Sequence, residues 1–162
     1  MRTVHAQTRP FADSDLAETV ELSLLAWEPA FESMEKVLGL QIFHLIWPDW
    51  KKSQAEGVAG ACKAADKYHT LVAELDGRVV GFVAYELKGE TSEVVLLAVH
   101  PEFQRRGIAT QLNVAALAEM KAAGMKMAVV ETGGEDGHAP ARRAYEKAGY
   151  TGLPLVRYFK DL

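Results

Sequence analysis

The chain has 162 residues, enough for one domain with a sizeable core, and its 49% hydrophobic and 25% charged residues are the ordinary mix of a soluble globular protein. The net charge of -4 and the lack of a long basic run exclude nucleic acid as the expected partner, whereas an acidic balance suits a cationic substrate such as an amine. Cys62 is the single cysteine, which excludes an intrachain disulfide; we expect a thiol packed on or near a helix, not a nucleophile.

No signal peptide is expected, because the N-terminal residues contain no apolar core region. A membrane span is not expected either, because no run of about 18 apolar residues occurs. The sequence therefore predicts a cytoplasmic protein without membrane contact.

The first third of the chain is predicted to be mainly helical after one short strand. Residues 4–8 form a candidate strand that ends before Pro10, and 13–15 offer an N-cap. Apolar residues then recur at helical spacing from Leu16 to Trp27. A second helical region is predicted over about 34–65, interrupted at Pro48. It carries the aromatic residues Phe43, Trp47 and Trp50.

The middle of the chain predicts three strands. Residues 71–75 and 78–87 flank an Asp-Gly pair, which is a strong hairpin signal. Residues 93–99 are apolar and β-branched enough for a buried central strand, which Pro101 ends.

The last third predicts alternating helices and strands. A helix over 108–123 is capped by Gly124, and a short strand follows over 127–131. After a glycine-rich loop, a helix begins near Pro140 and stops at Gly149. A last strand is predicted over residues 155–159. The element order predicts a single mixed α/β domain around one sheet, without a linker.

The segment from residue 93 to 123 has the pattern of an anion site. A strand feeds a glycine-bearing loop and then a helix, so several backbone N–H groups meet at a helix N-terminus that carries roughly half a positive charge. Gly107 lets the backbone approach a phosphate closely, and Ala109 is also small. Arg105 and Arg106 suit phosphate oxygens.

Two nucleotide-binding motifs are absent from this segment. A mononucleotide P-loop requires a Gly-Lys-Ser/Thr run, and no lysine follows Gly107. A dinucleotide fingerprint requires three spaced glycines and a downstream acidic residue, which are also missing. What remains is the pattern Gln/Arg-x-x-Gly-x-Gly/Ala.

Residues 98–109, Ala-Val-His-Pro-Glu-Phe-Gln-Arg-Arg-Gly-Ile-Ala, together with residues 141–150, Ala-Arg-Arg-Ala-Tyr-Glu-Lys-Ala-Gly-Tyr, resemble the GNAT superfamily of N-acetyltransferases. The resemblance spans about residues 71–150 and is only architectural before that. It implies a GNAT-type domain over 1–162, with an acceptor-side helical region over about 13–65 and a cofactor-binding core over about 71–150. Its mostly antiparallel sheet should splay between the strands at 93–99 and 127–131.

The resemblance also implies how acetyl-CoA is held. The pantetheine arm should lie between the splayed strands and bond the backbone of Leu97, Ala98 and Val99, where one N–H would face the thioester oxygen. His138 stands where the family commonly has an asparagine that contacts the pantetheine. The pyrophosphate should be held by residues 104–110, namely Gln104, Arg105, Arg106, Gly107, Ile108, Ala109 and Thr110.

Two catalytic residues are carried over from the family. Tyr145 is expected as the general acid for the departing thiolate, whose conjugate acid has a pKa of about 8.5. Glu93, eleven residues before Gln104, matches the position of the catalytic glutamate in the histone-acetylating branch, and a base is useful because a lysine-like amine has a pKa near 10.4. Glu131 is the alternative base.

The acceptor side is the least defined part of the sequence. Trp27, Phe31 and Glu131 are candidate substrate-binding residues, and Glu28 or Glu32 could bind a cationic acceptor. Aromatic residues at helical spacing are more often core, and that alternative stays open. The histidines have no metal-ligand spacing, so no metal is expected.

The predicted function is direct transfer of the acetyl group from acetyl-CoA to a primary amine through a ternary complex. The alternatives are a non-catalytic acyl-CoA-binding or regulatory domain of the same fold, and an enzyme for a longer acyl group. The acceptor, a small molecule or a peptide, is left open because fold does not decide it. Homodimers are common in the family, but no feature of this sequence requires one.

Overall fold

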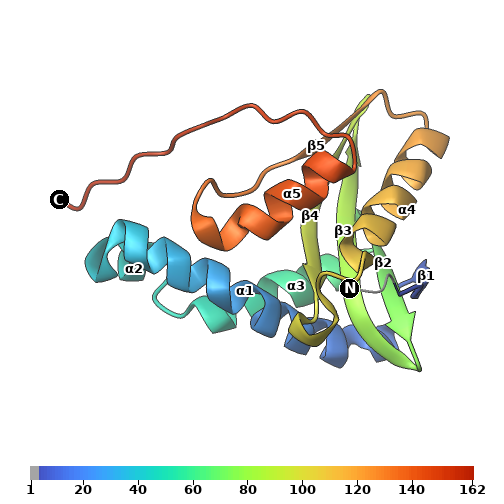
Figure 1. Ribbon diagram of the computed structural model, residues 1–162, viewed down its shortest axis with the longest axis horizontal. Helices are drawn as coiled ribbons and strands as arrows, with labels where there is room; N and C mark the ends of the chain where they lie inside the picture. Colours follow the sequence, from blue (N-terminus) through green and yellow to red (C-terminus); the bar gives the residue numbers. More distant parts are fainter. Residues whose placement is uncertain (1–3) are drawn as a thin grey trace.

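The computed structural model describes residues 4–162 and contains one five-stranded sheet with helices on both faces (Figure 1). The strand order is β1-β2-β3-β4-β5; the first four strands are antiparallel to their neighbours, and β5 is parallel to β4. The predicted mixed α/β fold with a mostly antiparallel sheet is confirmed. The strands are β1 (Gln7–Pro10), β2 (Tyr68–Leu75), β3 (Arg78–Lys88), β4 (Thr91–Val99) and β5 (Met127–Val130).

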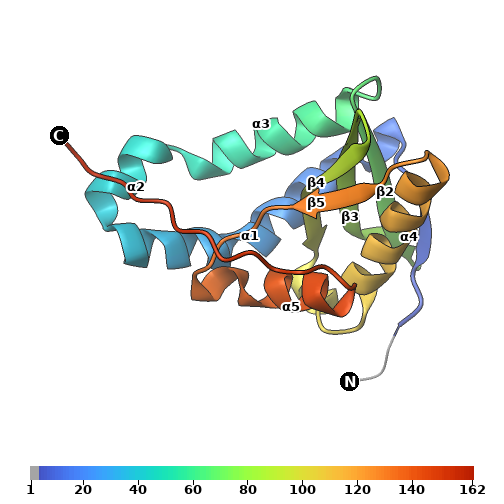
Figure 2. The ribbon, with the colours of Figure 1, turned by 90° about the horizontal axis from the view of Figure 1, so that it is seen from above.

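One face of the sheet is covered by helices from the first third of the chain, α1 (Leu16–Leu38), α2 (Leu40–Ile46) and α3 (Trp50–Lys63). Leu22 of α1 and Val58 of α3 pack there against Phe82 of β3. Figure 2 shows α4 (Ile108–Ala122) on the side of the sheet opposite α3. It shows α5 (Ala139–Lys147) next to α4. The face of α4 that carries Ile108 and Leu112 packs on the second apolar cluster. The helices that cover one face of the sheet therefore come from the first half of the chain, and the helix that covers the other face comes from the second half.

The hairpin between β2 and β3 has the predicted turn. Asp76 and Gly77 have φ values of 52° and 77° and lie between the paired residues Leu75 and Arg78. Positive φ at both central residues is the geometry that a two-residue hairpin requires and that Asp-Gly adopts readily.

The helical boundaries differ from those predicted in one respect. α1 continues past residue 34 to Leu38, and the first break in the helical region is at Gly39, whose φ is 77°. The prediction of a separate region starting near residue 34 is therefore wrong, whereas the interruption at Pro48 is confirmed, because α2 ends at Ile46 and α3 begins at Trp50. Asp15 precedes α1 but makes no side-chain cap to it, because its carboxylate accepts from Arg9 and from the Ala12 amide.

Both terminal strands were mispredicted. β1 covers Gln7–Pro10 rather than residues 4–8, since a proline fits an edge strand, where its missing N–H needs no partner. Residues 155–159 form no strand; they belong to an extended, exposed segment after α5 that meets no sheet edge within residues 4–162. A strand pattern alone cannot form a strand without a hydrogen-bonding neighbour. No helix within the described range combines the length and apolar character that a bilayer crossing needs.

Candidate active site

The parallel pairing of β4 with β5 is short. It joins Thr91 to Met127 and continues only to Val94 opposite Val130, whereas β4 runs on to Val99 while still paired with β3. Beyond Val94, the side of β4 that faced β5 has no strand partner within residues 4–162. Backbone groups of residues 95–99 on that side are therefore open to a ligand, except the Val99 carbonyl, which accepts from Gln104.

A β-bulge in β4 coincides with this point. Leu96 lies opposite Ala84 and Val94 lies opposite Tyr85, so Val95 is an extra residue. The packing shows the same shift, because Val94 and Leu97, three residues apart, both contact the cluster on the α4 face. A bulge bends its strand and increases the local twist. The parting of the two strands is therefore built into β4 itself.

The loop that leaves β4 leads directly to a helix N-terminus. Arg105 and Gly107 have φ values of 62° and 86°, and α4 begins at Ile108. The first amide bonded within the helix is that of Gln111, which donates to the Gly107 carbonyl. The amides of the three residues between, including Ala109 and Thr110, have no acceptor in the helix, and the helix dipole adds positive potential there. This end of α4 is suited to an anion such as a phosphate.

The long side chains of this loop have different surroundings. The Gln104 amide Nε2 donates to the Val99 carbonyl at 2.9 Å, so it fastens the loop to the end of β4. The Arg106 guanidinium lies 5.4 Å from the ring centre of Phe103, and Arg105 is exposed. The two arginines remain available to an anion, whereas Gln104 is already hydrogen-bonded.

Tyr145 projects from α5 into a largely buried environment. It is 8% exposed, and burial raises the pKa of its phenol well above its ordinary value, with the nearby Tyr150 adding to the effect. The Tyr150 ring meets it edge-on at 5.7 Å between centroids, and the Tyr150 amide donates to the Tyr145 carbonyl at 3.1 Å. Tyr145 therefore stays protonated at neutral pH and is held in one orientation.

Asn113 and Tyr150, which the sequence motifs did not point to, are among the described residues with buried polar atoms that have no partner. Neither amide atom of Asn113 on α4 has a hydrogen bond among the described residues, nor does the Tyr150 hydroxyl. Such groups cost free energy unless a ligand or water satisfies them. Asn113 interrupts the apolar pattern of α4 next to Leu112, which was a signal available in the sequence.

The carboxylates predicted as bases already lie near cations. Glu93 receives a 3.0 Å hydrogen bond from Lys88, is about one-third exposed, and lies just before the strands part, opposite Val129 of β5. Glu131 follows β5, is 77% exposed, and lies 4.0 Å from Arg157. Of the two, Glu93 is closer along the chain to the bulge.

The loop after β5 is tightly fastened. His138 Nδ1 pairs with the Glu135 carboxylate, and Arg142 donates to the carbonyls of Gly133 and Glu135. The Gly137 amide donates to Ser33 Oγ of α1 at 3.0 Å. The imidazole of His138 is therefore oriented by a carboxylate rather than free in solvent.

The candidate acceptor-side aromatic residues belong to packed layers. Phe31 is 7% exposed; its ring stacks on Trp50 at 4.4 Å and meets Trp47 edge-on at 5.6 Å. Trp27 packs on the cluster that contains Phe82. These contacts join α1, α2 and α3. They favour the core role for Phe31 over the substrate-binding role.

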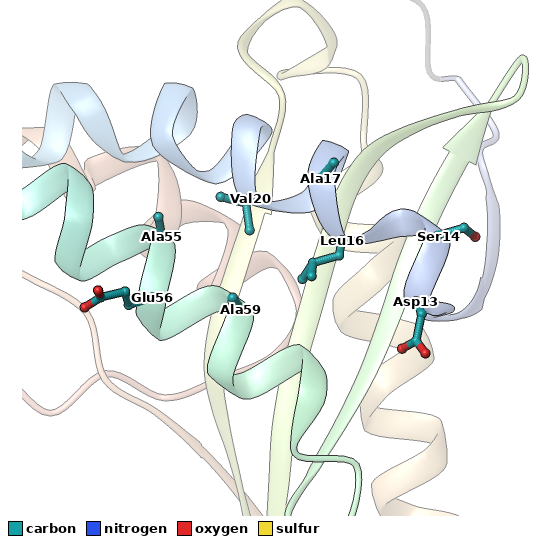
Figure 3. A pocket seen from close by; sticks show the side chains of 8 residues that line it. All are labelled: Asp13, Ser14, Leu16, Ala17, Val20, Ala55, Glu56 and Ala59. Carbon is teal, nitrogen blue, oxygen red and sulfur yellow. The ribbon is translucent and has the colours of Figure 1, made fainter.

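A surface groove lies between the start of α1 and α3 (Figure 3). Leu16 and Val20 point toward α3, where Ala55 and Ala59 lie. No part of β4, of residues 104–110 or of α5 lines it. The groove is therefore separate from the residues predicted for catalysis and cofactor binding.

Two other kinds of chemistry were considered for this chain, a cysteine nucleophile and a bound metal ion. Cys62 is buried on α3, and burial raises the pKa of its thiol to about 11, so little thiolate exists at neutral pH. Within residues 4–162 no group of three His, Cys, Asp or Glu side chains is arranged to hold a metal ion.

The geometry agrees with known proteins. Residues 39–150 match the acetyltransferase (GNAT) family. No curated protein sequence matches the chain. Many solved structures are similar in fold, among them the three described next. The PaiA N-acetyltransferase of Thermoplasma acidophilum in complex with coenzyme A superposes with a TM-score of 0.72 and 18% identity, over 91% of each chain.

Two further similar structures are aminoglycoside acetyltransferases. One is an aminoglycoside acetyltransferase from an uncultured soil metagenomic sample in complex with sisomicin, with a TM-score of 0.60, 18% identity, and 98% of this chain and 97% of that one covered. The second is an aminoglycoside antibiotic 6'-N-acetyltransferase from Acinetobacter haemolyticus, with a TM-score of 0.66, 16% identity, and coverage of 96% and 98%. At these identities the likeness establishes the fold, and the match over residues 39–150 establishes the family. The protein belongs to the acetyltransferase (GNAT) family.

Proposed function

We propose that the protein is an N-acetyltransferase that moves the acetyl group of acetyl-CoA directly to a primary amine. The observation that carries this proposal is the open edge of β4 beyond Val94, next to the anion-binding N-terminus of α4. A thioester carrying a long amide-containing arm and a pyrophosphate needs both features side by side.

The coenzyme is held at two places, its pyrophosphate at the start of α4 and its pantetheine arm along β4. The pyrophosphate is bound by the amides of Ile108, Ala109 and Thr110 and by Arg105 and Arg106, as the free helix amides and the left-handed Gly107 support. The amides of the pantetheine arm pair with Leu97, Ala98 and Val99 as an added strand would. His138, oriented by Glu135, contacts the same arm.

The chemistry needs an oxyanion site and a proton donor. The nitrogen lone pair of the neutral amine attacks the thioester carbonyl carbon, and a β4 backbone N–H in the stretch 97–99 stabilises the negative oxygen. When the carbon–sulfur bond breaks, the thiolate takes a proton from the Tyr145 hydroxyl, directly or through water, and the proton that the product nitrogen releases restores the phenol. The raised pKa of Tyr145 keeps that proton in place until the thiolate appears.

The amine must lose a proton before it attacks. Glu93 is proposed as the base, acting through water, because it is the carboxylate nearest in the strand to the point where β4 leaves β5. Its ion pair with Lys88 holds the carboxylate in place. Glu131, at the end of the neighbouring strand, is the alternative base.

The acceptor is proposed to be a small cationic molecule or peptide with a primary amine. The net charge of -4 favours such a substrate. Similar structures include acetyltransferases of aminoglycosides, which are polyamines of this kind. The fold does not select among amines, so the acceptor is defined by screening.

The proposal is tested with purified protein, acetyl-CoA and a panel of amines, with release of free thiol as the readout. The panel contains an aminoglycoside, a linear polyamine, an amino acid, a peptide with a free N-terminus and a lysine peptide. Thiol release that depends on one of these amines, with an acetylated product of matching mass, is expected. Tight binding of acetyl-CoA without release for any amine would contradict the proposed activity and favour a non-catalytic acyl-CoA-binding domain.

A further inference from the structure

Gly137 lies directly against α1, with no room for a side chain between the two backbones. It belongs to the short 3-10 helix η3 (Asp136–His138), which precedes α5. A Cβ added to Gly137 would meet three atoms of α1, namely Ser33 Cβ at 2.7 Å, Ala30 Cα at 2.8 Å and the Pro29 carbonyl oxygen at 2.8 Å. Two of these atoms belong to the backbone, so a side chain at this position forces η3 and α1 apart. The Gly137 amide also donates to Ser33 Oγ at 3.0 Å.

This contact fixes the beginning of α5. Ala139, the first residue of α5, has φ and ψ values of -56° and -38°, so η3 continues into α5 without an intervening loop. Outside residues 136–147, α5 packs mainly on α4. Figures 1 and 2 both show α5 running from beside α1 toward α4. The N-terminal end of α5 is therefore held by η3 at the surface of α1.

Crowding at Gly137 would displace η3 rather than α1. Phe31, which follows the contact residue Ala30, stacks on Trp50 at 4.4 Å and meets Trp47 edge-on, so this part of α1 is held from behind. The residues on the other side of the contact are exposed, among them Asp136 of η3 itself. The start of α5 therefore has space to move away from α1.

Tyr145 depends on where α5 begins. It lies eight residues after Gly137, or about 12 Å away at 1.5 Å per helical residue. Nonbonded carbon atoms prefer separations of about 3.5–4.0 Å, so a Cβ at Gly137 requires roughly 1 Å of additional space. A misplacement of about 1 Å in a reacting group lowers a rate by on the order of 100-fold.

We propose that Gly137, through its contact with Pro29, Ala30 and Ser33 of α1, positions Tyr145 for proton transfer to the thiolate. Gly137 acts through α5 and is a positioning residue, not a group that reacts. The inference rests on the proposed function, because a proton donor matters only where a thioester is cleaved.

The first test compares Gly137→Ala with Gly134→Ala in steady-state thiol release. Gly137→Ala should lower kcat by at least about ten-fold, while the KM for the amine and the Kd for coenzyme A stay within about three-fold, because α1 and the start of α4 are not displaced. Gly134 lies in the same loop, and a Cβ added there has no neighbour within 4 Å, so Gly134→Ala is the matched control and should behave as wild type. Equal kcat values for the two variants would overturn the proposal.

A double-mutant cycle separates positioning from general destabilisation. In a Tyr145→Phe background the positioned hydroxyl is absent, so adding Gly137→Ala should lower kcat by less than about two-fold. A further loss as large as in the wild-type background would show that Gly137 acts on something other than Tyr145, and would refute the positioning role.

Ser33→Ala is a second variant that adds no volume, and it decides the question where Gly137→Ala does not fold. It removes the acceptor of the Gly137 amide, so it should lower kcat by about three-fold in the wild-type background. In the Tyr145→Phe background it should have no effect. The same loss in both backgrounds would again contradict positioning of Tyr145.

Amide hydrogen exchange gives a measure that does not require turnover. With coenzyme A bound, the amides of residues 143–147, which are bonded within α5, should exchange about ten-fold faster in Gly137→Ala than in Gly134→Ala. A wild type that releases no thiol with any amine contradicts the acetyl transfer. Equal exchange of α5 in the two variants contradicts the role of Gly137 in holding this helix, whether or not the protein turns over.

Discussion

The Tyr145 side chain combines burial with a fixed orientation, and both bear on a proton donor. Burial raises its pKa, so the phenol keeps its proton well above neutral pH. The edge-on contact with Tyr150 restricts its ring. The Tyr145 phenol is therefore protonated and correctly oriented before the thiolate forms.

Replacing Tyr145 by Phe removes the hydroxyl and leaves the ring packing. We predict that kcat falls by about 100-fold, the lower range for loss of a general acid, while the Kd for coenzyme A stays within about two-fold. Steady-state thiol release and calorimetric titration measure the two quantities. Tyr68→Phe on β2 is the control and should change neither. A Tyr145→Phe variant with full activity would assign the proton to another donor.

The role of Glu93 is testable through the pH dependence of the rate. At pH 7 a lysine-like amine with a pKa near 10.4 is almost wholly protonated, so loss of a base should matter most there. We predict that Glu93→Gln lowers kcat/KM by on the order of 100-fold at pH 7 and by much less as the pH approaches 10. Glu90→Gln breaks an exposed ion pair with Lys126 and serves as the control. Equal loss at all pH values would indicate a structural role instead.

Residue types and spacing could indicate Tyr145 and the loop residues, but not what each side chain contacts. Gln104 belongs to the motif, yet its amide is used by the Val99 carbonyl five residues earlier. Phe31 has helical spacing that suits either a binding wall or a core, and its stacking on Trp50 depends on the position of α3. Such partners are set by tertiary packing, which the local pattern does not contain.

At the scale of elements, β4, its loop and α4 form the proposed anion site. The strand and helix were predictable from apolar runs and from glycine. The bulge was not, because residues 94–97 are all apolar and give no alternation from which an extra residue could be recognised. The parting of β4 and β5 was expected from the resemblance, and the bulge at Val95 supplies its physical cause.

Gly107 offers a sharp test of the anion site. Its φ of 86° costs a side-chain-bearing residue about 1–2 kcal/mol, and an added Cβ would also crowd a bound phosphate. We predict that Gly107→Ala raises the Kd for coenzyme A by at least about ten-fold. Gly124 has a similar φ of 83° at the other end of α4 and open space around it, so Gly124→Ala is the matched control.

Both glycine variants should lose similar thermal stability, because the backbone strain is alike. Only the first should weaken coenzyme binding, measured by calorimetry well below the melting temperature. Equal affinities for the two variants would place the pyrophosphate away from the start of α4.

For the molecule as a whole, the strand predictions succeeded where strands adjacent in sequence pair and failed at the chain ends. Residues 155–159 have the composition of a strand, but a strand also needs a free edge beside it, and the turn at Gly149 directs the chain elsewhere. β1 shifted to include Pro10 because its position is set by pairing with Leu71, more than sixty residues away. Pairing between distant segments is the part of the fold that local pattern leaves open.

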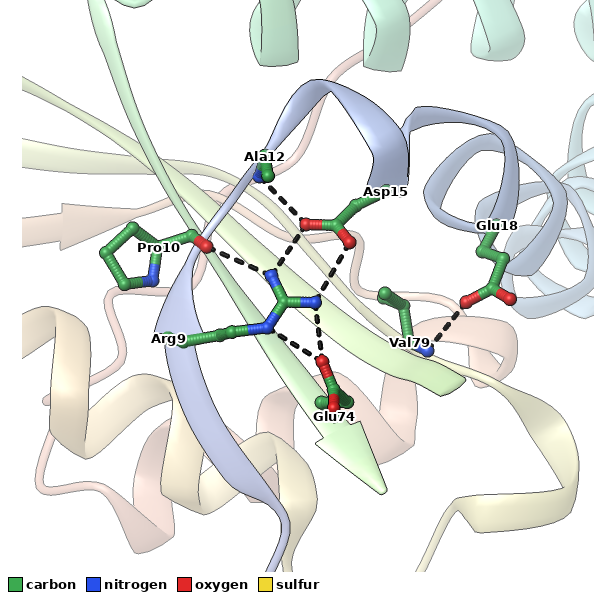
Figure 4. Close-up of polar contacts among 7 residues, drawn as sticks. All are labelled: Arg9, Pro10, Ala12, Asp15, Glu18, Glu74 and Val79. Atoms are coloured by element: carbon green, nitrogen blue, oxygen red, sulfur yellow. Dashed lines mark hydrogen bonds and ion pairs between the residues drawn. The ribbon is translucent and has the colours of Figure 1, made fainter. Parts of the chain in front are cut away.

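The stability of the whole molecule depends on an ion cluster that joins its first strand to its first helix (Figure 4). Arg9 donates to both carboxylate oxygens of Asp15, at 2.7 and 2.9 Å, and to Glu74 on β2 at 2.8 Å. Asp15 is 6% exposed, and Arg9 holds the pKa of its carboxyl below the usual range. The carboxylate therefore stabilises the fold above the unfolded-state pKa of about 3.9, and this contribution is lost as the pH falls through the lower folded-state pKa.

Asp15→Asn should accordingly lower the free energy of unfolding by about 2 kcal/mol at pH 7, the size expected for charge-assisted hydrogen bonds. The difference from wild type should begin to shrink below about pH 4, where Asp15 of the unfolded chain takes up its proton, and should vanish only below the lower pKa of the folded carboxyl. Urea titrations from pH 7 to pH 2.5 measure both effects. Asp13→Asn, an exposed change on the same turn, is the control and should follow wild type at every pH. A difference that persists undiminished at the lowest pH would mean that shape rather than charge makes Asp15 stabilising.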